Sequence, residues 1–178
     1  MIGCNLDIIR IPEDIHTIYS FMNADDQYLY STKLNFQSEM EFEKWLISRL
    51  ANDFHDFYVI RSDSDGKPLG YVHNYDFSLV DGHCKLVVYI CQNYRNTGIG
   101  GIAAVKFMKK LFSTYPLKKV YSTIYEYNKE SLRSNLAAGF IEEGVLKDYR
   151  YYNGTWHDIY YLSITRSQFA RTLGRLVK

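Results

Sequence analysis

The sequence predicts an α/β domain with a mixed, mostly antiparallel sheet of about seven strands and flanking helices. Two observations lead to this fold class. Segments rich in β-branched and aromatic residues are separated by Asp-Gly and Asn-Gly pairs, which favour tight hairpins between antiparallel strands. A long segment with helical periodicity separates two other strand-like segments, so those two strands should be parallel. The length of 178 residues suits one domain covering residues 1–178.

The N-terminal part of the chain predicts one edge strand and two helices. Residues 6–11 alternate in polarity and are closed by Pro12, as is typical of an edge strand. Residues 13–22 have the spacing of a short amphipathic helix, and a polar link follows them. Ser38 and Glu41 then form the capping-box pattern that opens a second helix.

The middle of the chain predicts an antiparallel meander. Three strands are expected at residues 57–61, 68–77 and 83–91, with Asp65-Gly66 and Asp81-Gly82 in the turns between them. Glycine in these pairs tolerates the positive φ angles that tight turns require. The third of these strands leads directly into a glycine-rich loop and a long helix.

The C-terminal part should add three strands and two helices. Asn128 is placed to cap a short helix, and Asn153-Gly154 is the strongest hairpin signal in the chain. The elements expected after the long helix are strand 119–126, helix 128–138, strands 140–152 and 156–165, and helix 166–176.

The segment 87–112 carries the clearest functional signal. A β-branched run is followed by Gly98, Gly100 and Gly101 and then by an uninterrupted helical pattern. The first N–H groups of a helix lack partners within it, and the helix dipole favours negative charge there. Glycine lets the backbone approach a phosphate, and Arg95, just ahead of the loop, can add a charge-assisted hydrogen bond. The segment therefore predicts a phosphate-binding site.

The order Arg95-x-x-Gly98-x-Gly100 resembles the [Gln/Arg]-x-x-Gly-x-[Gly/Ala] loop of the GNAT acetyltransferase superfamily, which holds the pyrophosphate of acetyl-CoA. Asn128 and the pair Gly139-Phe140 also match the spacing of that family. The closing hairpin resembles the branch of ribosomal-protein N-terminal acetyltransferases and spermidine acetyltransferases, through Gly144, Asp148, Asn153-Gly154, Trp156, Asp158 and Ser163. The resemblance covers nearly the full chain. It implies a GNAT-like fold with the cofactor loop between the fourth strand and the following helix.

The resemblance also implies an N-acetyltransferase that moves an acetyl group from acetyl-CoA, its co-substrate, to a primary amine by direct attack in a ternary complex. The amine would belong to a small molecule or to a protein N-terminus. The catalytic candidates are Asn128, Ser131 and Tyr127. The expected acetyl-CoA-binding residues are Tyr89, Ile90, Cys91, Arg95, Asn96, Thr97, Gly98, Ile99, Gly100, Gly101, Asn128 and Ser131.

Elementary chemistry supports the same arrangement. A strand whose partner splays away near residues 89–91 would leave free peptide groups that a pantetheine arm can bind like an added strand. One of these N–H groups could then stabilise negative charge on the thioester oxygen, a contribution of about 3 kcal/mol.

Two positions depart from the family pattern. The tyrosine that protonates the leaving thiolate in many relatives is replaced by Asn135, and a glutamate carried by some relatives falls on or near Lys85. The general acid and the general base therefore stay open, with His73, Asp76, Glu126 and His157 as candidate bases. The departures also keep a second hypothesis open, in which the chain is a non-catalytic CoA-binding or regulatory module.

The same residues also bear on three other chemistries. Gly98-x-Gly100-x-x-Ala103 satisfies a dinucleotide-binding fingerprint, but the preceding strand belongs to a meander and the expected acidic residue is missing. No Lys-Ser or Lys-Thr pair follows the glycines, which excludes a nucleoside triphosphatase loop. Cys91 is a candidate nucleophile, although free cysteines are mostly inert, buried side chains.

Composition limits the partners. Lys and Arg total 21 and Asp and Glu total 20, so the formal net charge of +1 gives no reason to expect nucleic acid or a membrane surface. The 3 scattered cysteines argue against a disulfide framework and favour a cytoplasmic location. No metal is expected, because no histidine or cysteine pairs have ligand spacing. We expect a monomer or a homodimer.

Overall fold

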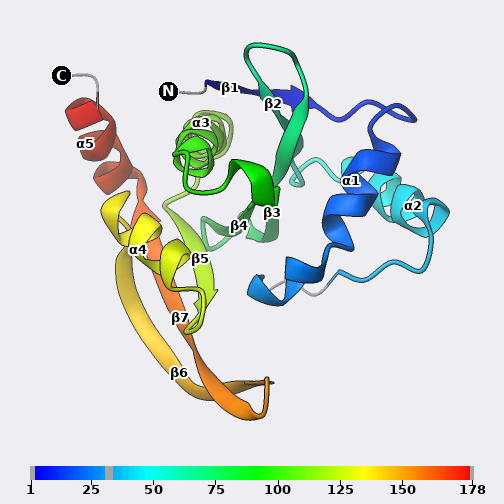
Figure 1. Ribbon diagram of the computed structural model, residues 1–178. Coiled ribbons are helices and arrows are strands. Elements are labelled where there is room, and N and C mark those ends of the chain that lie inside the picture. The colour runs from blue at the N-terminus through cyan, green and yellow to red at the C-terminus, as the bar shows by residue number, and fades with distance from the viewer. Residues whose placement is uncertain (1–2, 31–33, 177–178) are drawn as a thin grey trace.

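The computed structural model describes residues 3–30 and 34–176, and its strands form one sheet of seven in the order β1-β2-β3-β4-β5-β7-β6 (Figure 1). Neighbouring strands pair antiparallel except β4 and β5, which pair parallel. The strands are β1 (Cys4–Ile8), β2 (Phe57–Ser62), β3 (Pro68–Ser78), β4 (His83–Ile90), β5 (Lys119–Tyr125), β6 (Ile141–Tyr152) and β7 (Thr155–Thr165). The predicted mixed, mostly antiparallel sheet is therefore confirmed.

Helices cover both faces of this sheet. One buried cluster packs α1 and α2 against β2, β3 and β4, and the other packs α3 and α5 against the opposite face. The helices are α1 (Ile15–Met22), α2 (Glu39–Leu50), α3 (Ile99–Thr114), α4 (Lys129–Ala137) and α5 (Arg166–Leu176), with short 3-10 helices η1 (Asp25–Leu29) and η2 (Gln92–Tyr94). The α4 helix lies beside α3 and the end of β5 (Figure 1).

The parallel pair β4 and β5 separates soon after it forms. Within the described residues, its register runs only from His83–Lys119 to Lys85–Tyr121. β4 continues to Ile90 alongside β3, whereas β5 continues alongside β7. The sheet therefore opens between β4 and β5 on the side where α3 begins.

The N-terminal strand is the clearest difference from the sequence-based boundaries. The prediction placed it at residues 6–11, but β1 spans Cys4–Ile8 and pairs with β2. The chain leaves the sheet after Ile8 because the carboxylate of Asp14 accepts the backbone N–H of Arg10 at 2.7 Å and so closes a turn. The polar link after α1 also contains η1, which the sequence did not predict.

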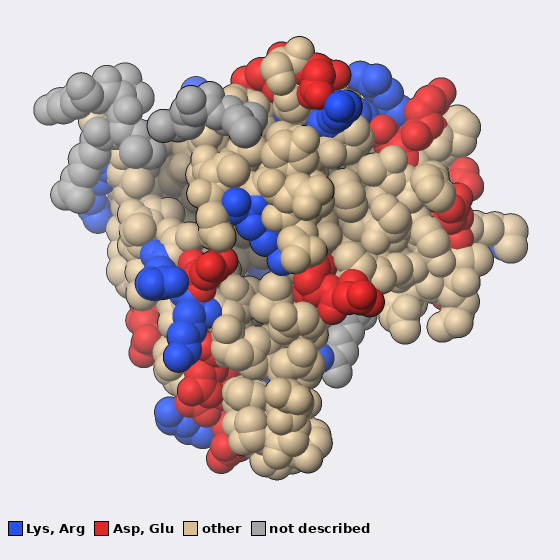
Figure 2. All heavy atoms as spheres, in the orientation of Figure 1, with Lys and Arg blue, Asp and Glu red and all other residues tan. Residues whose placement is uncertain are grey.

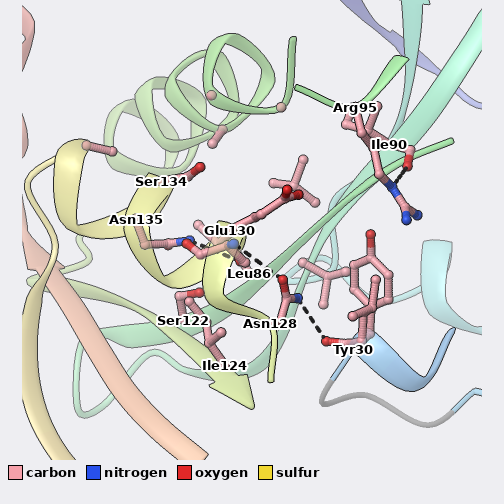
Figure 3. Close-up of a pocket in the computed structure, with 18 of the residues that line it drawn as sticks. Tyr30, Leu86, Ile90, Arg95, Ser122, Ile124, Asn128, Glu130, Ser134 and Asn135 are labelled. Atoms are coloured by element: carbon pink, nitrogen blue, oxygen red, sulfur yellow. Dashed lines mark hydrogen bonds between the residues drawn. The ribbon is translucent and has the colours of Figure 1, made fainter. Parts of the chain in front are cut away.

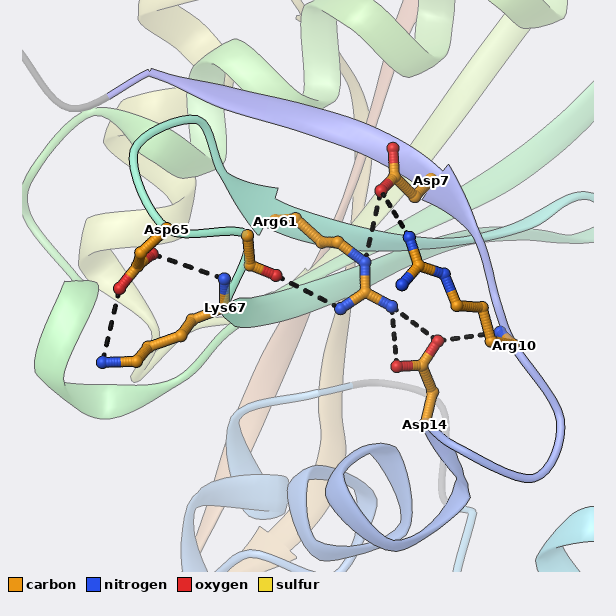
Figure 4. A network of polar contacts seen from close by, with 7 residues as sticks. Asp7, Arg10, Asp14, Arg61, Asp65 and Lys67 are labelled. Carbon is orange, nitrogen blue, oxygen red and sulfur yellow. Dashed lines mark hydrogen bonds and ion pairs between the residues drawn. The ribbon is translucent and has the colours of Figure 1, made fainter.

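A buried ion pair ties this turn to the sheet. Arg61 on β2 donates two hydrogen bonds to the Asp14 carboxylate, each of 2.6 Å, and its Nε lies 3.3 Å from Asp7 (Figure 4). The side chains of Arg61 and Asp14 are 8% and 6% exposed, so neither charge is solvated by bulk water. The pair holds Asp14, the N-cap residue of α1, against the sheet and so fixes where α1 starts.

No helix in residues 3–30 or 34–176 combines the length and the apolar character that crossing a bilayer requires.

Candidate functional site

The opening between β4 and β5 is the mouth of a cavity of about 280 Å³ (Figure 3). Its walls come from the end of β4, the start of α3, β5, α4 and the segment after η1. The molecular surface is hollowed near the centre of the view in Figure 2, and basic and acidic side chains both lie at its rim. The residues that line the cavity include Leu29, Tyr30, Leu86, Val87, Val88, Ile90, Arg95, Asn96, Gly98, Gly100, Gly101, Ser122, Thr123, Ile124, Asn128, Glu130, Ser131, Ser134 and Asn135.

One end of the cavity is formed by the N-terminus of α3. Gly98 is the N-cap in a left-handed conformation with φ of 86°, and no side chain caps the helix or puts negative charge in its first turn. The first intrahelical bond runs from the N–H of Ile102 to the carbonyl of Gly98, so the amides before it have no helical partner. A Cβ atom added at Gly98 would meet no atom within 4 Å, and one at Gly100 would meet only the Ile90 side chain, at 3.4 Å. This end therefore offers free amides and open space, which suits a phosphate group.

The exposed edge of β4 forms the middle of the cavity. The N–H of Cys91 donates to the carbonyl of Leu69 on β3 at 2.9 Å. Hydrogen-bonding direction alternates along an antiparallel strand, so the peptide groups of Val88 and Ile90 point away from β3, toward the opening. The expected splay near the end of β4 is thus present, and it begins after Lys85.

Arg95 occupies the wall where β4 ends. Its Nε donates to the Ile90 carbonyl at 2.9 Å, and its guanidinium forms an ion pair with Asp26 of η1. The guanidinium also lies over the ring of Tyr89, at 5.7 Å from the centroid. Arg95 therefore links η1 to β4 while still lining the cavity.

Tyr30 was not among the predicted site residues, yet it lines the cavity directly after η1 (Figure 3). Burial raises the pKa of the Tyr30 phenol to about 12, and the nearby Arg95 charge opposes this rise. The backbone of Ile90 and the Arg95 side chain near this hydroxyl also lower its pKa, against the larger effect of burial. Tyr30 is therefore a protonated phenol at neutral pH, held beside the end of β4.

The residues at the start of α4 form a second wall. Asn128 caps α4 by accepting the Ser131 N–H at 3.3 Å, and its Nδ2 donates to the carbonyl of Leu29 at 3.2 Å. The Ser131 hydroxyl accepts a hydrogen bond from Asn135 at 3.4 Å, and Asn128, Ser131 and Asn135 all line the cavity. Tyr127 does not line it, because its hydroxyl donates to the Tyr28 carbonyl at 2.7 Å.

The structure brings most of the predicted acetyl-CoA residues to this cavity, but not all of them. Those that line it are Ile90, Arg95, Asn96, Gly98, Gly100, Gly101, Asn128 and Ser131. Tyr89 lies in the core under α1, Ile99 is fully buried under α3, and the Thr97 hydroxyl donates to the Tyr94 carbonyl. Cys91 packs against the α1 side, and burial raises the pKa of its thiol, so it is poorly suited to act as a nucleophile.

The candidate bases are all engaged elsewhere. His73 is buried beneath α2, and burial lowers its pKa to about 3. Asp76 forms an ion pair with Lys85 at 2.8 Å, and Glu126 lies 3.7 Å from His157. In the parts of the chain that the structure describes, no group of three or more metal-ligating side chains is found.

Comparison with known proteins agrees with this geometry. Residues 6–141 match the family model described as an acetyltransferase (GNAT) domain. The chain is 27% identical over 170 residues to the SPbeta prophage-derived uncharacterized N-acetyltransferase YokL of Bacillus subtilis (strain 168), covering 94% of this chain and 93% of that protein. It is also 26% identical over 105 residues to the putative ribosomal N-acetyltransferase YdaF of the same organism, covering 59% of this chain and 57% of that protein.

Solved structures share the fold. The spermidine N-acetyltransferase from Vibrio cholerae, in complex with CoA and spermine, superimposes with a TM-score of 0.85 at 17% identity, covering 94% of this chain and 98% of that one. The chain resembles this branch in fold, as its closing hairpin predicted. Because the family model spans most of the sequence and the free helix terminus lies where that family's loop requires it, this chain is an acetyltransferase that belongs to the GNAT family.

Proposed function

We propose that this acetyltransferase moves the acetyl group of acetyl-CoA to a primary amine by direct attack within a ternary complex. The observation that carries the proposal is one continuous cavity, which joins the uncapped N-terminus of α3 to the open edge of β4. In the reaction a nitrogen–carbon bond forms, the carbon–sulfur bond breaks, the amine loses a proton and the leaving thiolate gains one.

The amides of Gly100 and Gly101 and the dipole of α3 would hold the pyrophosphate of acetyl-CoA. The proposal is supported by the absence of a side-chain cap or an acidic residue in the first turn of α3. Arg95 would add positive charge at the same end, although its guanidinium also pairs with Asp26.

The edge of β4 would bind the pantetheine arm and the thioester. The outward-facing peptide groups of Val88 and the N–H of Ile90, whose carbonyl already accepts from Arg95, can form hydrogen bonds with the amides of the arm, as a strand does at a sheet edge. An N–H group here would also stabilise negative charge on the thioester oxygen as the amine attacks. These contacts would direct the acetyl group into the opening between β4 and β5.

Protonation of the leaving thiolate needs a donor, and Asn135 stands where many relatives carry a tyrosine. Tyr30 is the donor that we propose, because it lines the cavity and its phenol keeps its proton at neutral pH. Ser131 and Asn128, which also line the cavity, would orient the arm, and Tyr127 would act indirectly by fixing Tyr28.

The cytoplasm is the proposed compartment, which the free cysteines Cys4, Cys84 and Cys91 support. One neighbouring structure is a dodecameric spermidine N-acetyltransferase from Vibrio cholerae. We propose a monomer or a homodimer for this chain, and light scattering after size-exclusion chromatography would test that assembly.

Calorimetry and a thiol-release assay test the function together. We expect acetyl-CoA to bind to the purified protein, and at least one amine from a chemically diverse panel to release CoA above the background of hydrolysis. Binding without release for every amine would favour a non-catalytic CoA-binding module. Absence of binding would overturn the proposal.

A further inference from the structure

The cavity passes through the sheet, so its far side shows where an acceptor would approach. Leu86 and Ile90 belong to the core under α3, whereas Val87 belongs to the core under α1 and α2. Thr123 lies on the same face as Val87, because its hydroxyl forms a hydrogen bond of 3.2 Å with Tyr75, which packs against the α1 cluster. Leu86, Val87, Ile90 and Thr123 all line the cavity, so the cavity is in contact with both faces of the sheet. If acetyl-CoA enters from the α3 side, as the proposed function requires, the amine must arrive over the opposite face.

Arg150 is a cation on that opposite face that has no carboxylate partner among the described residues. It lies on β6 opposite His157, and its guanidinium stands over the ring of Tyr125, at 4.9 Å from the centroid. Its Nη1 donates to the Tyr125 hydroxyl at 3.2 Å. Tyr125 follows Thr123 by two residues on β5, so the two side chains are about 7 Å apart on one face.

The guanidinium is incompletely satisfied. The Nε of Arg150 is buried and has no hydrogen-bond partner among the residues that the structure describes. A buried donor without a partner costs free energy, more so when it belongs to a charged group. A planar guanidinium with unused donors matches the two oxygens of a carboxylate or a phosphate.

Two carboxylates near the opening are already neutralised by other cations. Asp76 pairs with Lys85 at 2.8 Å, and Asp26 pairs with Arg95. Arg150, by contrast, forms no ion pair with the residues that the structure describes, and it contacts the hydroxyl and ring of Tyr125 instead.

Glu126 does not supply the missing partner. Its carboxylate lies 3.7 Å from the Nδ1 of His157 and accepts the backbone N–H of Asp158 at 3.3 Å. Asp158 in turn pairs with Lys147 at 2.7 Å. The charges on the closing hairpin thus leave Arg150 available to a ligand.

We propose that the acceptor of this acetyltransferase is a small amine that also carries an acidic group, a carboxylate or a phosphate, and that Arg150 binds that group. The proposal rests on the proposed acetyl transfer. It sets this chain apart from the spermidine N-acetyltransferase with which it shares a fold, since a guanidinium on the acceptor face, without a carboxylate partner among the described residues, disfavours a polycation.

Matched acceptor pairs test the proposal on the intact protein. One pair compares phosphoethanolamine with ethanolamine, and the other compares β-alanine with β-alaninamide. Spermidine serves as the cationic acceptor. The ratio kcat/KM is measured for every acceptor. We expect the acidic member of at least one pair to be better by about tenfold or more, as a charge-assisted contact provides. The two pairs separate phosphate from carboxylate recognition.

Substitutions test whether Arg150 causes the preference for an acidic acceptor. In Arg150→Gln the advantage of the acidic acceptor should disappear, while kcat/KM for its neutral partner and KM for acetyl-CoA stay unchanged. Arg150→Lys should retain part of the advantage. Lys147→Gln removes a positive charge from the same strand but from an exposed side chain, so it should leave the preference intact.

The outcomes separate the two proposals. If spermidine or the neutral amines are the better acceptors of the wild-type protein, or if the preference survives Arg150→Gln, the inference is wrong while acetyl transfer stands. If acetyl-CoA does not bind or no amine releases CoA, the proposed function itself fails. The wild-type panel decides the inference even if Arg150→Gln does not fold.

Discussion

The two ends of the cavity are built in different ways. The phosphate end consists mainly of backbone amides from one short segment, Gly98 to Gly101, at the start of α3. The other end is lined by side chains from η1 and β5, and Arg150 of β6 lies on the same face over Tyr125, so its parts are far apart in the sequence. A site made of local backbone can be recognised from spacing, whereas a site made of distant side chains depends on how the whole sheet is assembled.

This contrast predicts different responses to mutation. Changes that act through long-range contacts should affect stability or acceptor chemistry. Changes in the glycine loop should weaken the binding of acetyl-CoA and should have little effect on stability or on the choice of acceptor.

The largest expected effect is a loss of stability when the buried ion pair that positions α1 is broken. Arg61→Met should lower the free energy of unfolding by about 3–5 kcal/mol, because Asp14 then keeps a buried charge without its main partner. Urea denaturation measures this change. Lys67→Met, which removes an exposed partner of Asp65, should alter stability by less than about 1 kcal/mol. Equal effects from the two variants would show that the Arg61 pair has no special role.

The next effect is on the glycine loop. Gly100→Leu should raise the dissociation constant for acetyl-CoA by about a hundredfold, since the new side chain fills space beside Ile90 that the pyrophosphate needs. Calorimetry measures the constant. Gly174→Leu is the matched control, because Gly174 is also a helical glycine with open space around its Cβ position. Unchanged binding in Gly100→Leu would place the phosphates elsewhere.

Tyr30 should affect turnover rather than binding. Tyr30→Phe should lower kcat by about 10- to 100-fold without changing KM for acetyl-CoA, because only the proton donor is removed. Steady-state kinetics with a good acceptor measures both constants. Tyr28→Phe makes the same change two residues earlier, on a ring that stacks on Tyr152, and should leave kcat unchanged. A kcat that is the same in Tyr30→Phe and the wild type would exclude Tyr30 as the donor.

The smallest effect is expected at Arg95. Arg95→Ala should raise KM for acetyl-CoA by about tenfold, through loss of one charge-assisted bond to phosphate. Asp26→Asn tells this role apart from a purely structural one, because it breaks the same ion pair but leaves the guanidinium free. Asp26→Asn should not weaken acetyl-CoA binding. Equal losses in both variants would mean that Arg95 only holds η1 in place.

Much of the fold followed from local signals. Asn153-Gly154 correctly marked the turn between β6 and β7, and the helical segment after the glycines correctly implied a parallel pair. The end of β1 and the presence of η1 did not follow, because the first depends on Asp14, whose partner Arg61 lies 47 residues away, and the second on distant contacts with Arg95 and Asn128.

The site residues also differ in whether local sequence could predict them. Gly98 and Gly100 could be recognised from their spacing, since glycines between a strand and the start of a helix indicate a phosphate-binding loop. Tyr30 had no such signal, because it lies in a polar link with no periodic pattern. Its position follows from the contacts of η1 with Arg95 and with Asn128.

The sequence by itself determined the strand–loop–helix unit that offers amides to a phosphate, because hydrogen bonding at a helix start and the freedom of glycine are properties of neighbouring residues. The tertiary structure decided where β4 and β5 separate, which phenol lines the opening, and that the buried Nε of Arg150 has no hydrogen-bond partner in residues 3–30 and 34–176. Those features arise from pairings between distant strands and from burial, and neither is encoded within any one segment of the chain.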